Sequence, residues 1–111
     1  MPGLARRLSR PAVPVVALRF RRYLTAMPEI SRFLGIVVSI LYRDHEPPHF
    51  HATYGEYEAT ITIREGIVTG RFPRRALGHV LEWAELHRDE LAQNWDRARA
   101  REPLNRIAPL E

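Results

Sequence analysis

The pattern of apolar and polar residues predicts β-structure between residues 33 and 72. Residues 33–42 are almost continuously apolar and β-branched, which is typical of a strand with little solvent on either face. The segments that follow are shorter, and the two-residue sequences Gly55-Glu56 and Glu65-Gly66 predict tight turns between them. The expected strands are residues 33–42, 50–54, 57–63 and 67–72, arranged as a four-stranded antiparallel meander.

The side chains themselves indicate the register across these turns. If Tyr54 faces Tyr57, apolar residues meet apolar residues and polar residues meet polar ones. The predicted pairs are Ala52 with Ala59, Phe50 with Ile61, His51 with Thr60, and His49 with Thr62. Across the second turn the pairs are Ile63 with Val68, Ile61 with Gly70, and Thr60 with Arg71. Because side chains alternate between faces, a slip of one residue would destroy this agreement, so we expect His49, His51 and Arg71 on one polar face.

A single long helix is expected after the sheet. Proline favours the first turn of a helix, and residues 73–100 carry apolar side chains at spacings of three and four that form one stripe. The stripe consists of Leu77, Leu81, Ala84, Leu91, Trp95 and Ala98. Residues 101–111 contain two prolines and are predicted to be a non-helical tail. Residues 27–111 should therefore form a single α+β domain, a four-stranded antiparallel meander packed against one long C-terminal helix.

The basic residues are unevenly distributed along the 111-residue chain, whose net charge is +4. Residues 1–26 hold six arginines and no acid, a net charge of +6, whereas residues 27–111 hold eleven arginines against thirteen acids, a net charge of −2. The domain itself therefore gives no general argument for binding a polyanion. We expect residues 1–26 to be a basic leader without a fold of its own, and Met27 to be the natural start.

Composition disfavours several classes of protein. The sequence has no cysteine, so it has neither a disulfide framework nor a thiolate nucleophile, and a metal could be held only by histidine and carboxylate. No apolar run approaches the roughly 20 residues that span a bilayer, so we expect no membrane partner. The absence of cysteine fits the reducing cytoplasm, and we predict a cytoplasmic protein.

Three of the five histidines lie within the seven residues 45–51. Neutral imidazoles beside a carboxylate are suitable ligands for a divalent metal, which makes His45, His49 and His51 a candidate metal site. However, His49 and His51 are predicted to share a strand face, whereas His45 lies on the loop before Pro47-Pro48. This separation weakens a preformed three-histidine cage, and the sequence favours no cofactor.

Metal-independent cleavage of RNA is a second candidate chemistry. Attack by the 2′-hydroxyl needs a base, an acid and a cation for the phosphate, and His49, His51 and Arg71 supply these residue types on one predicted face. The alternative is a merely solvated face, since the outer side of a one-sided sheet is polar in any case. A further polar group follows one flank of the predicted helix: His87, Glu90 and Asn94. It forms either a second half of the site or a contact that pins the proline-containing loop to the helix.

The strand predicted at residues 33–42 also indicates a binding surface. It is apolar on both faces, although one helix covers only one face of the sheet, and this leaves Val37 and Leu41 without a partner. If the strand lies at the sheet edge, its unpaired backbone invites a partner strand or a second copy of the chain. Alternatively, the C-terminal tail covers it with Leu104, Ile107 and Leu110.

Taken together, these segments resemble the family known as domain of unknown function 4160. The segments are residues 27–33 (MPEISRF), 44–51 (DHEPPHFH), 54–59 (YGEYEA), 73–77 (PRRAL) and 81–88 (LEWAELHR), with Glu90, Leu91, Asn94 and Trp95. The resemblance covers residues 27–111 and implies a small bacterial protein, often encoded beside a short partner in an arrangement similar to toxin–antitoxin pairs. It predicts a toxin–antitoxin-like component that acts through a small antitoxin-like protein, with RNA as an alternative partner and catalysis left open.

Overall fold

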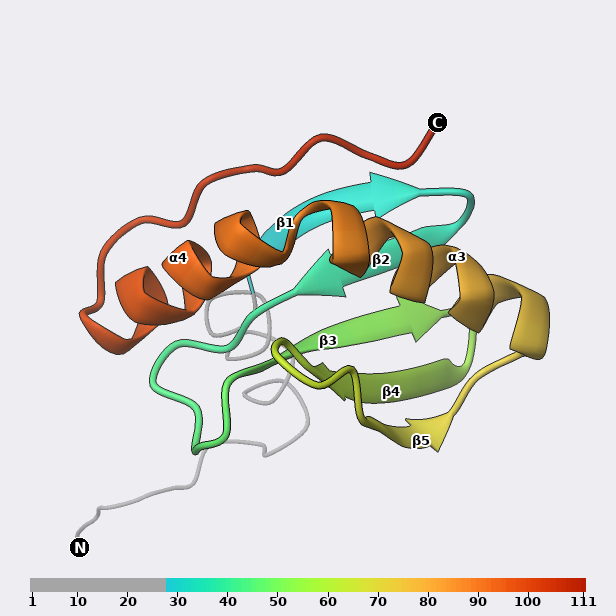
Figure 1. The fold of residues 1–111 in the computed structure, drawn as a ribbon, viewed down its shortest axis with the longest axis horizontal. Helices are drawn as coiled ribbons and strands as arrows, with labels where there is room; N and C mark the ends of the chain where they lie inside the picture. The colour runs from blue at the N-terminus through green and yellow to red at the C-terminus, as the bar shows by residue number, and fades with distance from the viewer. Residues whose placement is uncertain (1–27) are drawn as a thin grey trace, which may run out of the picture.

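The computed structural model describes residues 28–111, which form one sheet with two helices packed against it (Figure 1). The strands are β1 (Glu29–Phe33), β2 (Ile36–Ser39), β3 (His49–Tyr54), β4 (Tyr57–Thr62) and β5 (Val68–Arg71), and the helices are α3 (Arg74–Leu86) and α4 (Arg88–Arg99). The strands are antiparallel and adjacent in chain order. The α+β meander is thus confirmed, with one more strand and one more helix than predicted. The leader and start expected for residues 1–27 lie outside the described residues.

The strand predicted at residues 33–42 is wrong in its boundaries. Leu34 and Gly35 have φ angles of 52° and 81° and form a two-residue turn that joins β1 to β2. Two positive φ angles match the twist of a hairpin turn. The sequence pattern conceals this turn because Leu34 continues the apolar run. As a result β2 is paired on both sides, with β1 and β3, and the edge strand on this side is β1.

The register predicted for the first hairpin is confirmed at every pair, from Tyr54 with Tyr57 to His49 with Thr62. The second register is wrong by two residues, since Ile61 pairs with Val68 and Thr60 with Thr69. Thr62 causes the shift by closing a four-residue loop, residues 63–66. Its N–H donates to the Ile67 carbonyl at 3.0 Å, and its hydroxyl accepts from the Ile67 N–H at 2.8 Å.

The predicted helix is interrupted at His87, where φ is −121° and ψ is 28°. The predicted stripe is shifted on α3, where the buried residues are Ala76, Val80 and Trp83. Leu77, Leu81 and Ala84, which the stripe included, are only half-buried. In the structure Arg88 turns outward and pairs with Glu85 at 2.5 Å. The two helices bury the following side chains against the sheet: Ala76, Val80, Trp83, Leu91, Asn94, Trp95 and Ala98. No helix among residues 28–111 is long and apolar enough to cross a membrane.

The C-terminal tail is fixed along β1 and the helices (Figure 1). The Asn94 side chain donates to the Asn105 carbonyl and accepts from the Asn105 N–H, both at 2.8 Å. The Trp83 indole donates to the Ala108 carbonyl, and the Ile107 N–H donates to the Ile30 carbonyl of β1, each at 2.8 Å. The tail therefore packs beside β1. The alternative in which it covers the strand predicted at residues 33–42 is not the arrangement found at residues 36–41.

We expect Asn94→Ala to lower the free energy of unfolding by about 1–3 kcal/mol, because it removes two hydrogen bonds at a buried position and leaves both Asn105 backbone groups without their partner. Urea unfolding followed by tryptophan fluorescence measures the change. Gln93→Ala, an exposed neighbour on the same helix, is the control, with an expected change below about 0.5 kcal/mol. Equal stability of the two variants would show that this contact does not hold the tail.

Candidate metal centre

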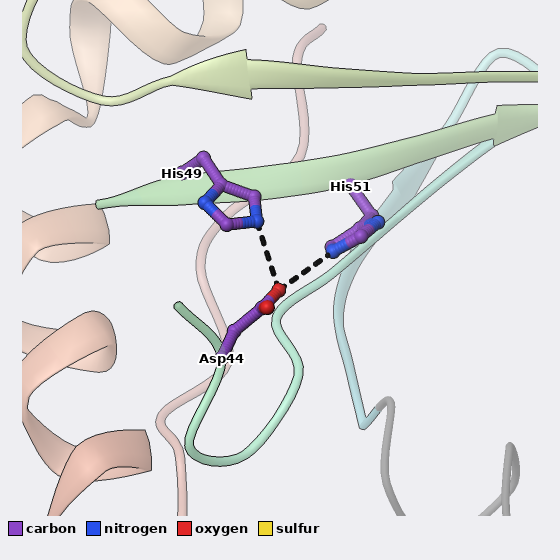
Figure 2. A group of neighbouring side chains, drawn as sticks. All are labelled: Asp44, His49 and His51. Atoms are coloured by element: carbon purple, nitrogen blue, oxygen red, sulfur yellow. Dashed lines mark hydrogen bonds and ion pairs between the residues drawn. The ribbon is translucent and has the colours of Figure 1, made fainter. Parts of the chain in front are cut away.

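The loop between β2 and β3 folds back over the outer face of the sheet and places Asp44 above the start of β3. His49 and His51 are two residues apart on β3, so their side chains point to the same face. Figure 2 shows both imidazoles directed at the Asp44 carboxylate. Three residues from one short segment therefore converge, because the strand orients two of them and the returning loop supplies the third.

The convergence is close and shielded from solvent. His49 Nε2 lies 2.8 Å from Asp44 Oδ2, and His51 Nε2 lies 3.2 Å from the same oxygen. The exposed fractions of the side chains are 10% for Asp44, 7% for His49 and 13% for His51. One donor atom from each residue lies within 4.8 Å of the other two. Among the described residues, this is the group of histidines and acids arranged closely enough to hold a metal ion.

The protonation of His49 is constrained by the backbone. Its Nδ1 lies 2.7 Å from the Pro47 carbonyl oxygen, and a carbonyl only accepts, so Nδ1 carries a proton. A neutral ring then directs its Nε2 lone pair at Asp44 Oδ2. Two acceptors at 2.8 Å repel each other, so either a second proton or a cation must lie between them.

His51 differs from His49 in its second ring nitrogen. Nδ1 of His51 is buried and has no hydrogen-bond partner among residues 28–111. Nothing in this part of the chain therefore fixes the tautomer of His51. Its Nε2 is free to present either a proton or a lone pair to Asp44.

The surroundings favour an ionised Asp44. Burial raises the pKa of Asp44, but the contacts with His51 and His49 and the hydrogen bond from the His45 N–H at 2.8 Å lower it by more. The pKa of Asp44 is therefore below its usual value. The centre accordingly holds a carboxylate rather than a neutral acid at physiological pH.

These atoms fit a divalent metal. Histidine nitrogen and carboxylate oxygen bind zinc at about 2.0–2.2 Å, which in a tetrahedral site places neighbouring ligand atoms about 3.3–3.6 Å apart. The two distances to Asp44 Oδ2, 2.8 and 3.2 Å, are hydrogen-bond lengths, so the three side chains would have to separate slightly to admit the ion. The hydrogen bond from His49 Nδ1 to a backbone carbonyl is the outer contact that orients ligating histidines in metal sites.

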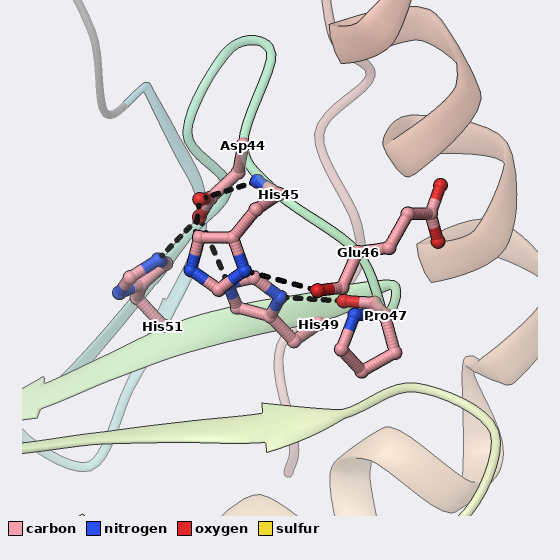
Figure 3. Close-up of polar contacts among 6 residues, drawn as sticks. All are labelled: Asp44, His45, Glu46, Pro47, His49 and His51. Carbon is pink, nitrogen blue, oxygen red and sulfur yellow. Dashed lines mark hydrogen bonds and ion pairs between the residues drawn. The ribbon is translucent and has the colours of Figure 1, made fainter.

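His45, predicted as a third histidine ligand, has its ring 5.2 Å from that of His49, measured between ring centroids (Figure 3). Its Nδ1 is 3.0 Å from the Glu46 carbonyl, its Nε2 is 3.6 Å from Asp44 Oδ1, and its side chain is 82% exposed. The structure thus brings Asp44 together with His49 and His51 and leaves His45 on the solvent side. The Glu46–Pro47 peptide that follows it is cis.

Helix α4 holds this loop from the other side. The ring of Trp95 lies 5.3 Å from that of His49, and the Arg99 guanidinium lies 5.8 Å from the Trp95 ring. Arg99 Nη1 donates to Glu46 Oε2 at 2.6 Å. Trp95 and Arg99 therefore connect the helix to both ends of the segment 46–49.

Residues 35–96 match the family described as Domain of unknown function (DUF4160). The chain belongs to this family. The match spans β2 to α4 and includes Asp44, His49, His51 and Trp95. Neither the curated proteins nor the solved structures contain a significant match to the chain.

The other predicted site residues of the DUF4160 domain lie elsewhere. Arg71 lies on the same face of the sheet as the two histidines, as predicted, but it is opposite Glu58 instead of Thr60. It lines a separate hollow with Tyr57 and does not join the histidines. His87 contacts Glu90 at 2.5 Å where the helices meet, and Asn94 holds the tail. The three helix residues predicted as a second half-site or as a pin for the loop therefore do neither, and the pin is made by Trp95 and Arg99.

Asp44 is the residue that sequence reasoning missed. It precedes His49 by five residues and His51 by seven, spacings that no regular strand or helix would bring together. Its signal in the sequence is its place at the head of the segment DHEPPHFH. Asp44 contacts the two histidines only because the loop folds back over β3.

We expect Arg99→Ala to speed amide hydrogen exchange at His45 by roughly tenfold, since the ion pair and the cation–π contact that it removes each contribute up to about 1 kcal/mol. Arg97→Ala is the matched control, because Arg97 donates to the Pro103 carbonyl in the tail instead. Equal exchange at His45 in both variants would exclude a role for Arg99 in holding the loop.

Proposed function

We propose that this DUF4160 domain binds a divalent transition metal through Asp44 Oδ2, His49 Nε2 and His51 Nε2. The observation that carries the proposal is the Pro47 carbonyl, which accepts the Nδ1 proton of His49 at 2.7 Å. That contact leaves the other ring nitrogen to face a carboxylate that His51 also contacts. A metal ion engages all three atoms, whereas without one His49 must carry a second proton and His51 must carry its proton on Nε2.

The types of ligand limit which metal ions can bind. Two imidazoles and one carboxylate suit zinc, iron, cobalt or nickel in the divalent state, whereas magnesium and calcium prefer oxygen ligands throughout. Metals that need thiolate are disfavoured because the chain has no cysteine. Two histidines and one carboxylate on one side of the ion form the arrangement found in non-haem iron enzymes and in several catalytic zinc sites. Enzymatic activity fits this arrangement and forms no part of the proposal.

Protein purified without a histidine tag should bind one Zn²⁺ or Co²⁺ per chain in isothermal titration calorimetry. We expect at least about 100-fold weaker metal binding in each of three variants, Asp44→Asn, His49→Ala and His51→Ala. The reason is that even the loss of a hydrogen-bond partner of a ligating residue lowers metal affinity 10–100-fold. Asp44→Asn is the most informative of the three, because it keeps the size of the side chain and removes its charge.

Two histidine variants serve as controls for this titration. His79→Ala, on α3, should leave the affinity unchanged, and His45→Ala should have a much smaller effect than His51→Ala. Equal losses for His45→Ala and Asp44→Asn would favour a site that includes all three histidines of the loop. Unchanged affinity in Asp44→Asn would contradict the proposal.

The alternative of a metal-independent ribonuclease has less support. It needs a cation beside His49 and His51 to bind the phosphate, and Arg71 lines a different hollow. Asp44, an anion, stands in the place where that phosphate would lie. Incubation of metal-free protein with total RNA tests this alternative, and cleavage that His51→Ala and Arg71→Ala both abolish would revive it.

We further propose a toxin–antitoxin-like role through a small protein partner in the cytoplasm, as the family resemblance implies. Strand addition or dimerisation through residues 33–42 requires an edge strand, whereas β2, residues 36–39, lies between β1 and β3. Within the described sheet, β5 is the edge strand that has no tail beside it, and the neighbouring Ile67 is 58% exposed. Unpaired edge strands accept a further strand through their backbone.

If a partner adds a strand to β5, amide exchange in residues 68–71 should slow at least about tenfold in the complex. The complex is obtained by co-expressing the chain with the product of the neighbouring reading frame, and exchange is followed by mass spectrometry. Residues 29–33 of β1 provide the internal comparison. Protection of β1 with no change in β5 would contradict the proposed surface.

A further inference from the structure

A groove opens beside the proposed metal ligands. It encloses about 580 Å³ and is bordered by Asp44, His49 and His51. The rest of its wall includes Leu41, Pro47, Thr60, Thr62, Ile67 and Thr69. A volume of this size is in the range of small-molecule sites. The strands β4 and β5 form its floor, and the loop that carries Asp44 forms one side.

The groove leaves coordination positions open. The protein supplies one atom from each of three residues, and transition metals take four to six ligands. The remaining wall offers aliphatic side chains and threonine hydroxyls, which are poor partners for such metals. His45 is 82% exposed and its Nδ1 is held by the Glu46 carbonyl at 3.0 Å, so it stands beside the opening. The groove borders all three ligating residues and is therefore the route by which a second molecule would reach the metal.

The charge of the groove limits what can enter. A divalent metal and the Asp44 carboxylate together give one positive charge, and no arginine borders the groove. One negative charge on the ligand is therefore balanced, whereas a polyphosphate or a nucleic-acid backbone would keep uncompensated charge. Leu41, Pro47 and Ile67 favour an apolar body behind the charged head.

From these features we infer that the groove binds a small monoanion whose carboxylate-like head completes the metal coordination and whose short apolar body lies against Leu41 and Ile67. This inference rests on the proposed metal site and adds a class of ligand to it. The site is thus of the exchangeable kind, with labile positions, rather than a closed structural centre.

Hydroxamates serve as probes, because they are monoanionic chelators that differ only in the attached body. The full chain is loaded with Co²⁺, and its visible absorption is followed during titration with benzohydroxamate or acetohydroxamate. Both should change the spectrum saturably, and benzohydroxamate should bind about tenfold more tightly because its ring buries apolar surface in the groove. Ile67→Ser should reduce this preference about threefold or more without altering Co²⁺ affinity.

Leu86→Ser is the matched control, since Leu86 is an exposed leucine on α3 outside the groove. It should change neither the affinity for Co²⁺ nor the affinity for the hydroxamates. Bound Co²⁺ whose spectrum neither hydroxamate alters would overturn this inference and leave the metal site standing. Equal affinity for the two probes, unchanged by Ile67→Ser, would overturn the apolar part. Failure to bind Co²⁺ at all would overturn the proposed metal site and this inference with it.

Discussion

The orientation of the His49 ring is the constraint on which the rest of the site depends. The ring is held between the Pro47 carbonyl at Nδ1 and the Asp44 carboxylate at Nε2, and the Trp95 ring packs beside it. With Nδ1 protonated, a largely buried carboxylate and a lone pair meet unless a second proton or a metal cation lies between them. The fold supports this arrangement from both sides, because β3 fixes the direction of the histidines and α4 fixes the loop through Arg99.

The sequence predicts the parts of the fold that depend on turn residues and on the regular spacing of apolar side chains. The pairing of β3 with β4 follows from Gly55-Glu56 and the alternation of side chains, because any one-residue slip would put polar groups in the core. The shared face of His49 and His51 follows from the same rule. The helical region is predicted for a similar reason, since its apolar spacing has one period on both sides of His87.

The parts that escape prediction depend on contacts between distant residues or on backbone angles. A leucine with positive φ at residue 34 carries no turn signal, so the hairpin of β1 and β2 stays hidden in an apolar run. The side-chain closure by Thr62 lengthens the next loop and moves Arg71 away from the histidines. Asp44 reaches them only because its loop returns over the sheet.

Tautomer-resolved NMR of the histidines tests the metal site most directly. Long-range proton–nitrogen correlation spectra of ¹⁵N-labelled protein are recorded before and after addition of one equivalent of Zn²⁺. The account predicts a proton on His49 Nδ1 in both states, and zinc-dependent shifts of Nε2 in His49 and His51 but not in His79 or His87. A neutral His49 with its proton on Nε2, or spectra of His49 and His51 that zinc leaves unchanged, would contradict it.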